Sequence, residues 1–256
     1  MFIDTHAHLY LEHFKEDIDF VVELTRESGV EHVYLPNVDS ETTGELLNLV
    51  ECYPDMMHPM MGIHPCSIKE NYLDELRHAE EELGKGNYVA IGEIGIDLYW
   101  EKTFHKEQKK AFERQIEWSR DLGLPFVIHS RESLDETIST VEKLQKGDLK
   151  GIFHCFNGTE EQGRRIEDQG FFIGIGGVLT YKNSGVRENI VNLSLDFMVL
   201  ETDAPYLSPT PFRGKRNQSN YIPIIAEQLA IVKEVDLKTI ADITTKNAIE
   251  VFGTPN

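Results

Sequence analysis

The sequence has little cysteine and no long hydrophobic run, and each shortage excludes a class of protein. Its three cysteines, Cys52, Cys66 and Cys155, are odd in number and form no CxxC pair. This argues against a disulfide framework and for a reducing compartment, so we expect a cytoplasmic protein. No apolar run reaches the ~18–20 residues of a membrane-spanning helix. No charged leader with an apolar stretch precedes Phe2, so we also expect no secretory signal and no membrane partner.

Positive charge is scarce as well. The chain has 25 Lys and Arg residues against 44 Asp and Glu residues, a formal net charge of −19. Taken alone, this balance weighs against a protein that coats nucleic acid, because such binding neutralises phosphates with cationic side chains. It leaves room for an enzyme with one local basic strip, or for one whose bound metal ions supply the positive charge.

The order of apolar and amphipathic stretches indicates the fold. The 256 residues match the length of one eight-fold α/β barrel, with a doubly wound sheet as the alternative. Short apolar or β-branched runs alternate with longer amphipathic stretches, which predicts parallel βα units with right-handed crossovers. Eight such units favour the barrel. We therefore predict an α/β fold, a single-domain (β/α)8 TIM barrel over residues 1–256.

The expected elements follow from these runs. Strands are predicted at Phe2–His8, His32–Val38, Met57–His64, Tyr88–Gly95, Pro125–His129, Gly151–Phe156, Phe171–Val178 and Phe197–Thr202. Helices are predicted at Phe14–Glu27, Thr42–Cys52, Leu73–Leu83, His105–Leu122, Leu134–Gln145 and Glu160–Gln169, with closing helices at Tyr221–Lys233 and Leu237–Phe252. The stretch Asn183–Leu193 is a poor helix.

Polar residues gather at the predicted strand ends. In a barrel the active site lies where strands end and βα loops begin. Six of the eight strands bring a histidine or a carboxylate to that mouth. These residues are His6, His8, His64, Glu93, His129, His154, Glu201 and Asp203. Ligands from separate strands converge there on fixed backbones, as a hydrolytic metal site requires.

The His6-x-His8 pair is the most specific local signal. Alternate residues of a strand point to one side, so both imidazoles face the barrel axis and can hold one ion. A site of imidazole and carboxylate ligands suits zinc. Magnesium or manganese become plausible as the proportion of carboxylate ligands rises. A single strand-end histidine is as often a core residue, but the whole set predicts a metal site. His64 precedes Pro65 and is expected to contact substrate rather than metal. The remaining histidines are expected to be structural or solvated: His13, His32, His58, His78 and His105.

Several of these segments together resemble a known family. They are His6-Ala7-His8, Met61–Pro65, Gly92–Asp97, His129-Ser130-Arg131, Phe153–Phe156, Leu200–Tyr206 and the loop Phe212–Asn217. In order and spacing they are similar to the signatures of the TatD family of metal-dependent deoxyribonucleases, from the first residues to the C-terminal helices. One departure is Gln218-Ser219, where the family commonly has Glu-Pro.

The resemblance implies roles for the polar residues. His6 and His8 would bind one divalent ion and His129 with His154 a second, with Glu93 bridging both. Asp203 would complete the site, and would orient and deprotonate the attacking water. The catalytic residues are then Asp203 and Glu93. Glu201 is assigned either a further ion or support of the other ligands.

The resemblance also implies a substrate. The protein would be a 3′–5′ exodeoxyribonuclease that acts through a two-metal-activated water on single-stranded or frayed DNA, with no obligate protein partner. Arg131 and the loop residues Arg213, Lys215 and Arg216 are the expected phosphate contacts, since guanidinium groups bind phosphate bidentately. A solvated basic turn is the alternative for that loop. Stacking partners for bases are sought among Tyr99, Trp100, Phe156 and Tyr206, although core or rim packing explains each one more simply.

Two other functions stay open from the residues alone. The same metal chemistry serves hydrolases of small esters, amides or phosphoesters, and the acidic net charge slightly favours them. A non-enzymatic scaffold that keeps its metals is the third hypothesis, and the intact ligand set argues against it. Asp97 and Glu132 are either supports of the metal ligands through hydrogen bonds or ordinary loop carboxylates.

Overall fold

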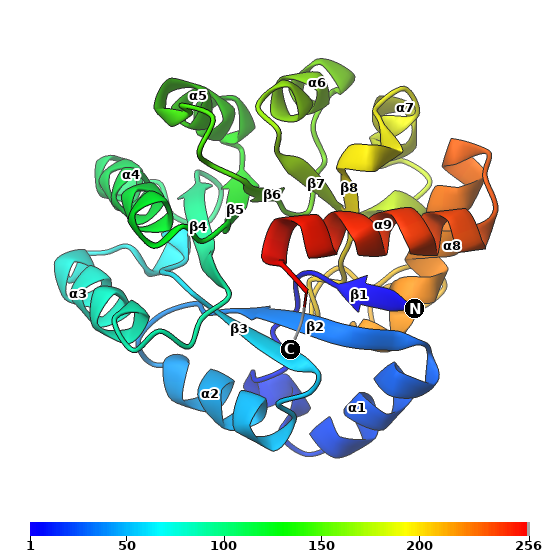
Figure 1. Ribbon diagram of the computed structural model, residues 1–256, viewed down its shortest axis with the longest axis horizontal. Coiled ribbons are helices and arrows are strands. Elements are labelled where there is room, and N and C mark those ends of the chain that lie inside the picture. The colour runs from blue at the N-terminus through cyan, green and yellow to red at the C-terminus, as the bar shows by residue number, and fades with distance from the viewer. Residues whose placement is uncertain (255–256) are drawn as a thin grey trace.

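A computed structural model, which describes residues 1–254, contains one eight-stranded parallel sheet in sequential strand order (Figure 1). The strands are β1 (Phe2–Asp4), β2 (Val30–Pro36), β3 (Met57–Met61), β4 (Ala90–Asp97), β5 (Phe126–Arg131), β6 (Gly151–Phe153), β7 (Phe172–Ile175) and β8 (Met198–Leu200). The main helices are α1 (Ile18–Glu27), α2 (Thr43–Cys52), α3 (Tyr72–Leu83), α4 (His105–Leu122), α5 (Leu134–Leu144), α6 (Glu160–Asp168), α7 (Val186–Ile190), α8 (Ile222–Lys233) and α9 (Leu237–Phe252). The predicted single-domain barrel is confirmed.

The barrel closes between β1 and β8 through residues that follow the two strands. The Thr5 N–H donates to the carbonyl of Leu200 at 3.0 Å, and the Asp203 N–H donates to the carbonyl of His6 at 2.9 Å. The first strand was predicted to reach His8, but the β1–β2 ladder ends at Asp4. Beyond it the Ala7 N–H still donates to Tyr34 of β2, but His6 and His8 bond to Asp203 and Ala204 after β8, so the closure brings His6 and His8 beside Asp203.

An apolar layer fills the interior of the barrel below the strand ends. Each strand contributes one residue to it: Ile3, Tyr34, Met60, Ala90, Val127, Ile152, Phe172 and Val199. Ala248 and Val251 of α9 complete the layer, and α9 lies across this end of the barrel (Figure 1). The barrel is therefore packed at its N-terminal end, and only the C-terminal end is left for a site.

The helix α9 is anchored at that end by polar contacts. Its Asn247 amide donates to the carbonyls of Leu195 and Met198, which precede or begin β8.

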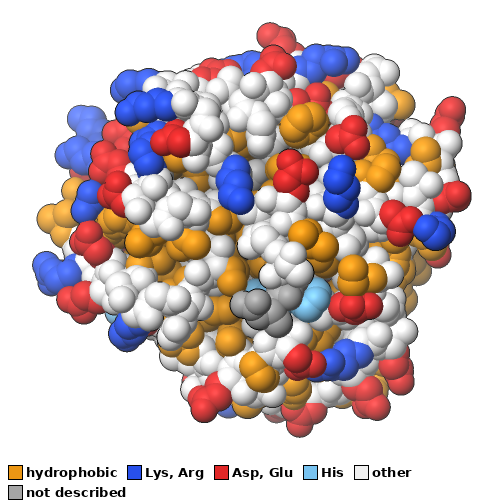
Figure 2. Space-filling view, viewed as in Figure 1, with side chains coloured by type: hydrophobic (Ala, Val, Ile, Leu, Met, Phe, Trp, Pro, Cys, Tyr) orange, Lys and Arg blue, Asp and Glu red, His pale blue; other side chains and the backbone are white. Residues whose placement is uncertain are grey.

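On the same face, acidic and basic side chains are interspersed over the surrounding helices (Figure 2). Within residues 1–254, no helix combines the length and the apolar character that crossing a bilayer requires.

Local sequence signals set several helix ends. Thr159 and Gln162 form a reciprocal capping box at the start of α6, and Asp236 caps α9 through the Thr239 N–H. Gly123 ends α4 with a φ of +66°. The stretch 183–193 forms only the five-residue α7, preceded by Gly185 at a φ of +73°, which accounts for its poor helical pattern.

The close approach of β5 and β6 depends on Gly151. A Cβ added there would lie 2.0 Å from the carbonyl oxygen of Phe126, whereas one added at Gly44 in α2 would meet nothing within 4 Å. We expect Gly151→Ala to lower the free energy of unfolding by at least ~1–3 kcal/mol, because two backbones must separate. The matched Gly44→Ala should leave it unchanged or raise it by up to ~1 kcal/mol. Urea unfolding midpoints measure both changes, and equal midpoints would contradict this account of the strand packing.

Candidate metal centre

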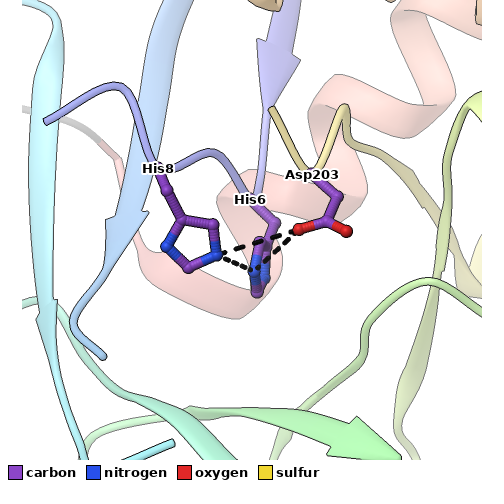
Figure 3. Close-up of side chains that lie close together, drawn as sticks. All are labelled: His6, His8 and Asp203. Atoms are coloured by element: carbon purple, nitrogen blue, oxygen red, sulfur yellow. Dashed lines mark hydrogen bonds and ion pairs between the residues drawn. The ribbon is translucent and has the colours of Figure 1, made fainter. Parts of the chain in front are cut away.

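The first group of ligands joins the two ends of the barrel sheet. His6 and His8 follow β1, Asp203 follows β8, and their side chains point toward one another (Figure 3). The Nε2 atoms of the two histidines lie 3.2 Å apart, and each lies 3.8 Å from Oδ1 of Asp203. Two imidazoles and one carboxylate therefore converge on one point, as the alternation of the strand predicts.

Glu93 of β4 links this group to a second one. Its Oε2 lies 3.3 Å from Nε2 of His6 and 3.5 Å from Nε2 of His8. Its Oε1 lies 2.8 Å from Nδ1 of His129 and 2.8 Å from Nε2 of His154, on β5 and just after β6. One carboxylate thus touches both pairs of imidazoles with different oxygens, so it could bridge two cations if each pair held one.

Hydrogen bonds determine which ring nitrogen of His8 carries a proton. Its Nδ1 lies 3.0 Å from the Tyr10 oxygen, and the Tyr10 hydroxyl donates to the carbonyl of Pro36. Because the only Tyr10 proton goes to Pro36, the Tyr10 oxygen must accept from Nδ1–H of His8. The neutral imidazole then carries a lone pair on Nε2, the atom that faces His6 and Asp203.

The second pair has carboxylates on both sides. Nε2 of His129 lies 2.9 Å from Oδ2 of Asp97, and its Nδ1 lies 2.8 Å from Oε1 of Glu93. Nδ1 of His154 faces Oε1 of Glu201 at 3.5 Å, and its Nε2 lies 2.8 Å from Oε1 of Glu93. To bind a cation beside Glu93, the two rings would present Nδ1 of His129 and Nε2 of His154, with the outer N–H groups directed at Asp97 and Glu201. A carboxylate behind a histidine is the usual support of a metal-ligating imidazole.

The donor set fits divalent cations. Three groups have ligand atoms within 4.8 Å of one another: His6 with His8 and Asp203, His6 with Glu93 and His154, and His64 with Glu93 and His129. Lone pairs of imidazoles and carboxylates that face one another repel unless a cation lies between them. Imidazole nitrogens with carboxylate oxygens are the ligands of zinc and related first-row ions, so the cluster is suited to divalent metal ions.

Burial acts differently on the carboxylates of Glu93 and Asp203. It disfavours the charge of Glu93, yet the surrounding histidines, His154 first and then His6, outweigh it and hold the Glu93 pKa well below its usual value. Burial raises the pKa of Asp203 to about 6, and His154 and His8 offset this only in part. The Asp203 side chain is 14% exposed whereas that of Glu93 is 2% exposed, so Asp203 is the carboxylate within reach of water.

Comparison with known proteins agrees with this site. The family model described as TatD related DNase matches residues 3–253. The chain belongs to the TatD family.

It is 34% identical over 253 residues to the uncharacterized metal-dependent hydrolase YabD of Bacillus subtilis, covering 98% of this chain and 99% of YabD. It is 33% identical over 193 residues to YcfH of Escherichia coli, another uncharacterized metal-dependent hydrolase, covering 75% of this chain and 72% of YcfH. The crystal structure of YjjV, a TatD homologue from Escherichia coli, superposes with a TM-score of 0.93 at 27% identity and covers 99% of this chain and 98% of its own. This TatD protein is therefore a metal-dependent hydrolase.

His64 adds a hydrogen-bond donor to the TatD site. Its Nδ1 accepts from the Cys66 N–H at 3.0 Å, so its proton lies on Nε2, 3.7 Å from Oε1 of Glu93. Burial lowers the pKa of His64 to about 3, which keeps the ring neutral. An Nε2–H group offers a bond to an anionic oxygen but no lone pair to a cation. These contacts fit the predicted substrate role of His64 better than a metal role.

The predicted basic contacts lie in different places. Arg131 borders the cavity of about 510 Å³ that holds the metal ligands, and it also borders a neighbouring groove that Arg213 lines. Lys215 lines neither of these. Arg216 bonds to both carboxylate oxygens of Asp17, at 2.7 Å each, and packs over Phe14. This pair ties the loop after β8 to the start of α1. Because the charge of Arg216 is already paired there, its position does not support the predicted phosphate contact.

Three supporting residues complete the TatD site. Glu201 is fully buried, accepts from the Cys155 N–H at 2.7 Å and lies behind His154, where Gly174 leaves room for it. These contacts favour the supporting role over a further ion. Asp97, left open from the sequence, supports His129. Tyr10 was missed, although its place two residues after His8 continues the alternation of His6 and His8.

The support by Asp97 is testable through the tautomer of His129. The N–H groups of Tyr99 and Trp100 both donate to Oδ1 of Asp97, at 2.8 and 2.7 Å. In Asp97→Asn they retain the amide oxygen, so the amide NH2 faces Nε2 of His129 and forces its proton onto Nδ1. We expect the affinity for the metal to fall about 10–100-fold, measured by competition with a chromogenic chelator.

The control for this variant is Glu132→Gln, in an exposed carboxylate after β5 that pairs with Lys102. It neutralises one charge near the site without touching a ligand, so its metal affinity should equal that of the wild type. An Asp97→Asn protein that binds metal as tightly as this control would show that Asp97 does not set the tautomer of His129.

Proposed function

We propose that this TatD protein hydrolyses DNA phosphodiester bonds, and that it removes nucleotides from the 3′ end of a single strand or a frayed duplex. The observation that carries the proposal is the pair of imidazole groups bridged by Glu93 beneath an open cavity. When bound there by these residues, two divalent ions of zinc, magnesium or manganese type would activate a water and neutralise the charge that develops on phosphoryl oxygens.

The protein's own residues supply the remaining steps. Asp203 is the partly exposed carboxylate beside His6 and His8, placed to orient the attacking water and accept its proton. A base whose pKa lies near 6 keeps enough of its basic form for this task at neutral pH. The Nε2–H of His64 and the guanidinium of Arg131 border the same cavity and would hold the phosphate, while the 3′ oxygen of the preceding nucleotide leaves.

A second candidate is hydrolysis of a small ester, amide or phosphoester at the same site. The metal cavity of about 510 Å³ lies within the ~300–1,000 Å³ typical of small-ligand pockets, and the chain carries a net charge of −19. Both observations suit a compact substrate. For either reaction we propose a cytoplasmic protein, in keeping with Cys52, Cys66 and Cys155, which are all free thiols.

The exonuclease proposal predicts how a labelled strand is shortened. Metal-stripped protein is given a 5′-labelled single-stranded DNA, with Mg²⁺, Mn²⁺ or Zn²⁺ added back. We expect shortening one nucleotide at a time that depends on the metal. Asp203→Asn should slow it by about 10²–10⁴-fold, the usual contribution of a general base. Denaturing gels resolve the products.

Asp121→Asn is the matched control, because Asp121 is an exposed carboxylate at the end of α4, before β5 begins, and so lies at the end of the barrel opposite the strand ends that carry the ligands. It should digest DNA at the wild-type rate. If no metal supports digestion but a small ester or phosphoester is cleaved in an Asp203-dependent way, the second candidate replaces the first.

A further inference from the structure

A groove of about 1310 Å³ adjoins the metal cavity on the C-terminal side of the barrel. Its walls come from the end of β5, the loops after β6, β7 and β8, and α8. Arg131 and Asn157 border both the groove and the metal cavity, so the two spaces meet at these residues. We call this space, lined among others by Arg131, Lys182, Arg187 and Arg213, the cationic groove.

The charge of the cationic groove is opposite to that of the chain. Four cations line it, against the two carboxylates Glu132 and Glu227, although acidic residues outnumber basic ones by 44 to 25 in the whole sequence. One of the two carboxylates, Glu132, pairs with Lys102 at 3.3 Å. Positive charge is therefore concentrated beside the metal centre of an otherwise acidic protein.

The cations of the groove are available to a ligand. Among residues 1–254, Arg131, Lys182 and Arg213 have no carboxylate within ion-pair distance, in contrast to Arg216 beside Asp17. Lys182 and Arg213 are exposed. Arg187 is different, because it bonds to the carbonyls of Leu179 and Thr180 and holds the groove wall in place.

Aromatic rings accompany two of these guanidinium groups. Arg213 lies over the ring of Tyr181 at 4.4 Å, and Arg131 lies over the ring of Tyr99 at 4.4 Å. Guanidinium planes and aromatic rings are the surfaces on which unpaired bases stack. A cationic groove with stacking surfaces tracks a single-stranded backbone without reading its sequence.

We propose that the cationic groove binds the nucleotides of an unpaired DNA strand that precede the one held at the metal centre. The inference rests on the proposed function and adds where the rest of the strand lies. The groove's volume of about 1310 Å³ exceeds the ~1,000 Å³ upper range of small-ligand pockets, as an extended ligand requires. Its opening into the metal cavity at Arg131 and Asn157 gives the strand a continuous path.

The test compares substrate lengths in the metal-loaded enzyme. We would measure kcat/KM on oligo-dT of two, four and eight nucleotides, and the binding of 5′-fluorescein oligo-dT by anisotropy at several salt concentrations. The variant is Lys182→Ala with Arg213→Ala. Its control is Lys146→Ala with Lys150→Ala, which removes the same charge from exposed residues before β6, at the opposite end of the barrel.

We expect kcat/KM of the wild type and the control to rise with substrate length. The groove variant should lose about 10–100-fold on the octanucleotide and nothing on the dinucleotide. The slope of log affinity against log salt should fall by up to about 1.4, since each phosphate contact to a single strand contributes ~0.7.

Each other outcome is decisive as well. If the groove variant keeps the length dependence while the wild type digests DNA, the proposed function stands and the groove proposal is overturned. If the wild type digests no DNA, the proposed function fails and anisotropy alone decides about the groove. In that case, length-dependent binding that is lost in the groove variant alone supports the groove, and its absence overturns it.

Discussion

The carboxylate of Glu93 is the contact on which the centre of this molecule depends. It reaches imidazoles that follow β1, lie on β5 and follow β6, and each of its two oxygens serves a different pair. A buried carboxylate is strongly unfavourable unless opposite charge or donors surround it. Imidazoles surround it, and Tyr10, Asp97 and Glu201 lie behind those of His8, His129 and His154. With the outer N–H groups directed at these partners, the inner nitrogens are free to accept a cation. The supports outside the ligands thus decide what the ligands can bind.

The barrel accommodates such a polar cluster because its apolar packing residues and its polar site residues lie at different ends. The apolar layer with one residue from each strand, covered by α9, lies at one end. The polar residues lie at the other end, where the strands leave the ladder. Because strand backbones are held by parallel pairing, the ligand Cα positions do not depend on the loops, and those loops are free to differ in shape and charge. The groove beside the metal cavity is built mainly from such loops, together with α8.

Much of this architecture could be predicted because it follows from local periodicity. The bounds of His105–Leu122 and Leu237–Phe252 are those predicted, and the strand-end rule brought His6, Glu93 and Asp203 to one mouth. What failed or was missed depends on contacts between distant segments. Arg216 pairs with Asp17 across most of the chain, and Tyr10 acquires its role only because Pro36 of the next strand accepts its proton. No composition or period encodes such pairings, since they arise only when the barrel closes.

The net charge of −19 does not describe the electrostatic surroundings of the metal cavity in the folded molecule. At physiological ionic strength, exposed charges are screened beyond ~8 Å, so a substrate in the metal cavity responds to the nearest groups and not to the total. Many acidic side chains are already neutralised on the helical surface, as Glu142 is by Arg165. Besides the histidines and carboxylates of the centre, the metal cavity is bordered by the guanidinium of Arg131, and the cationic groove adjoins it there. An acidic chain can therefore bind an anion at one place, and on the proposed function this local charge would favour a polyanionic substrate at the groove and the metal cavity over the rest of the surface.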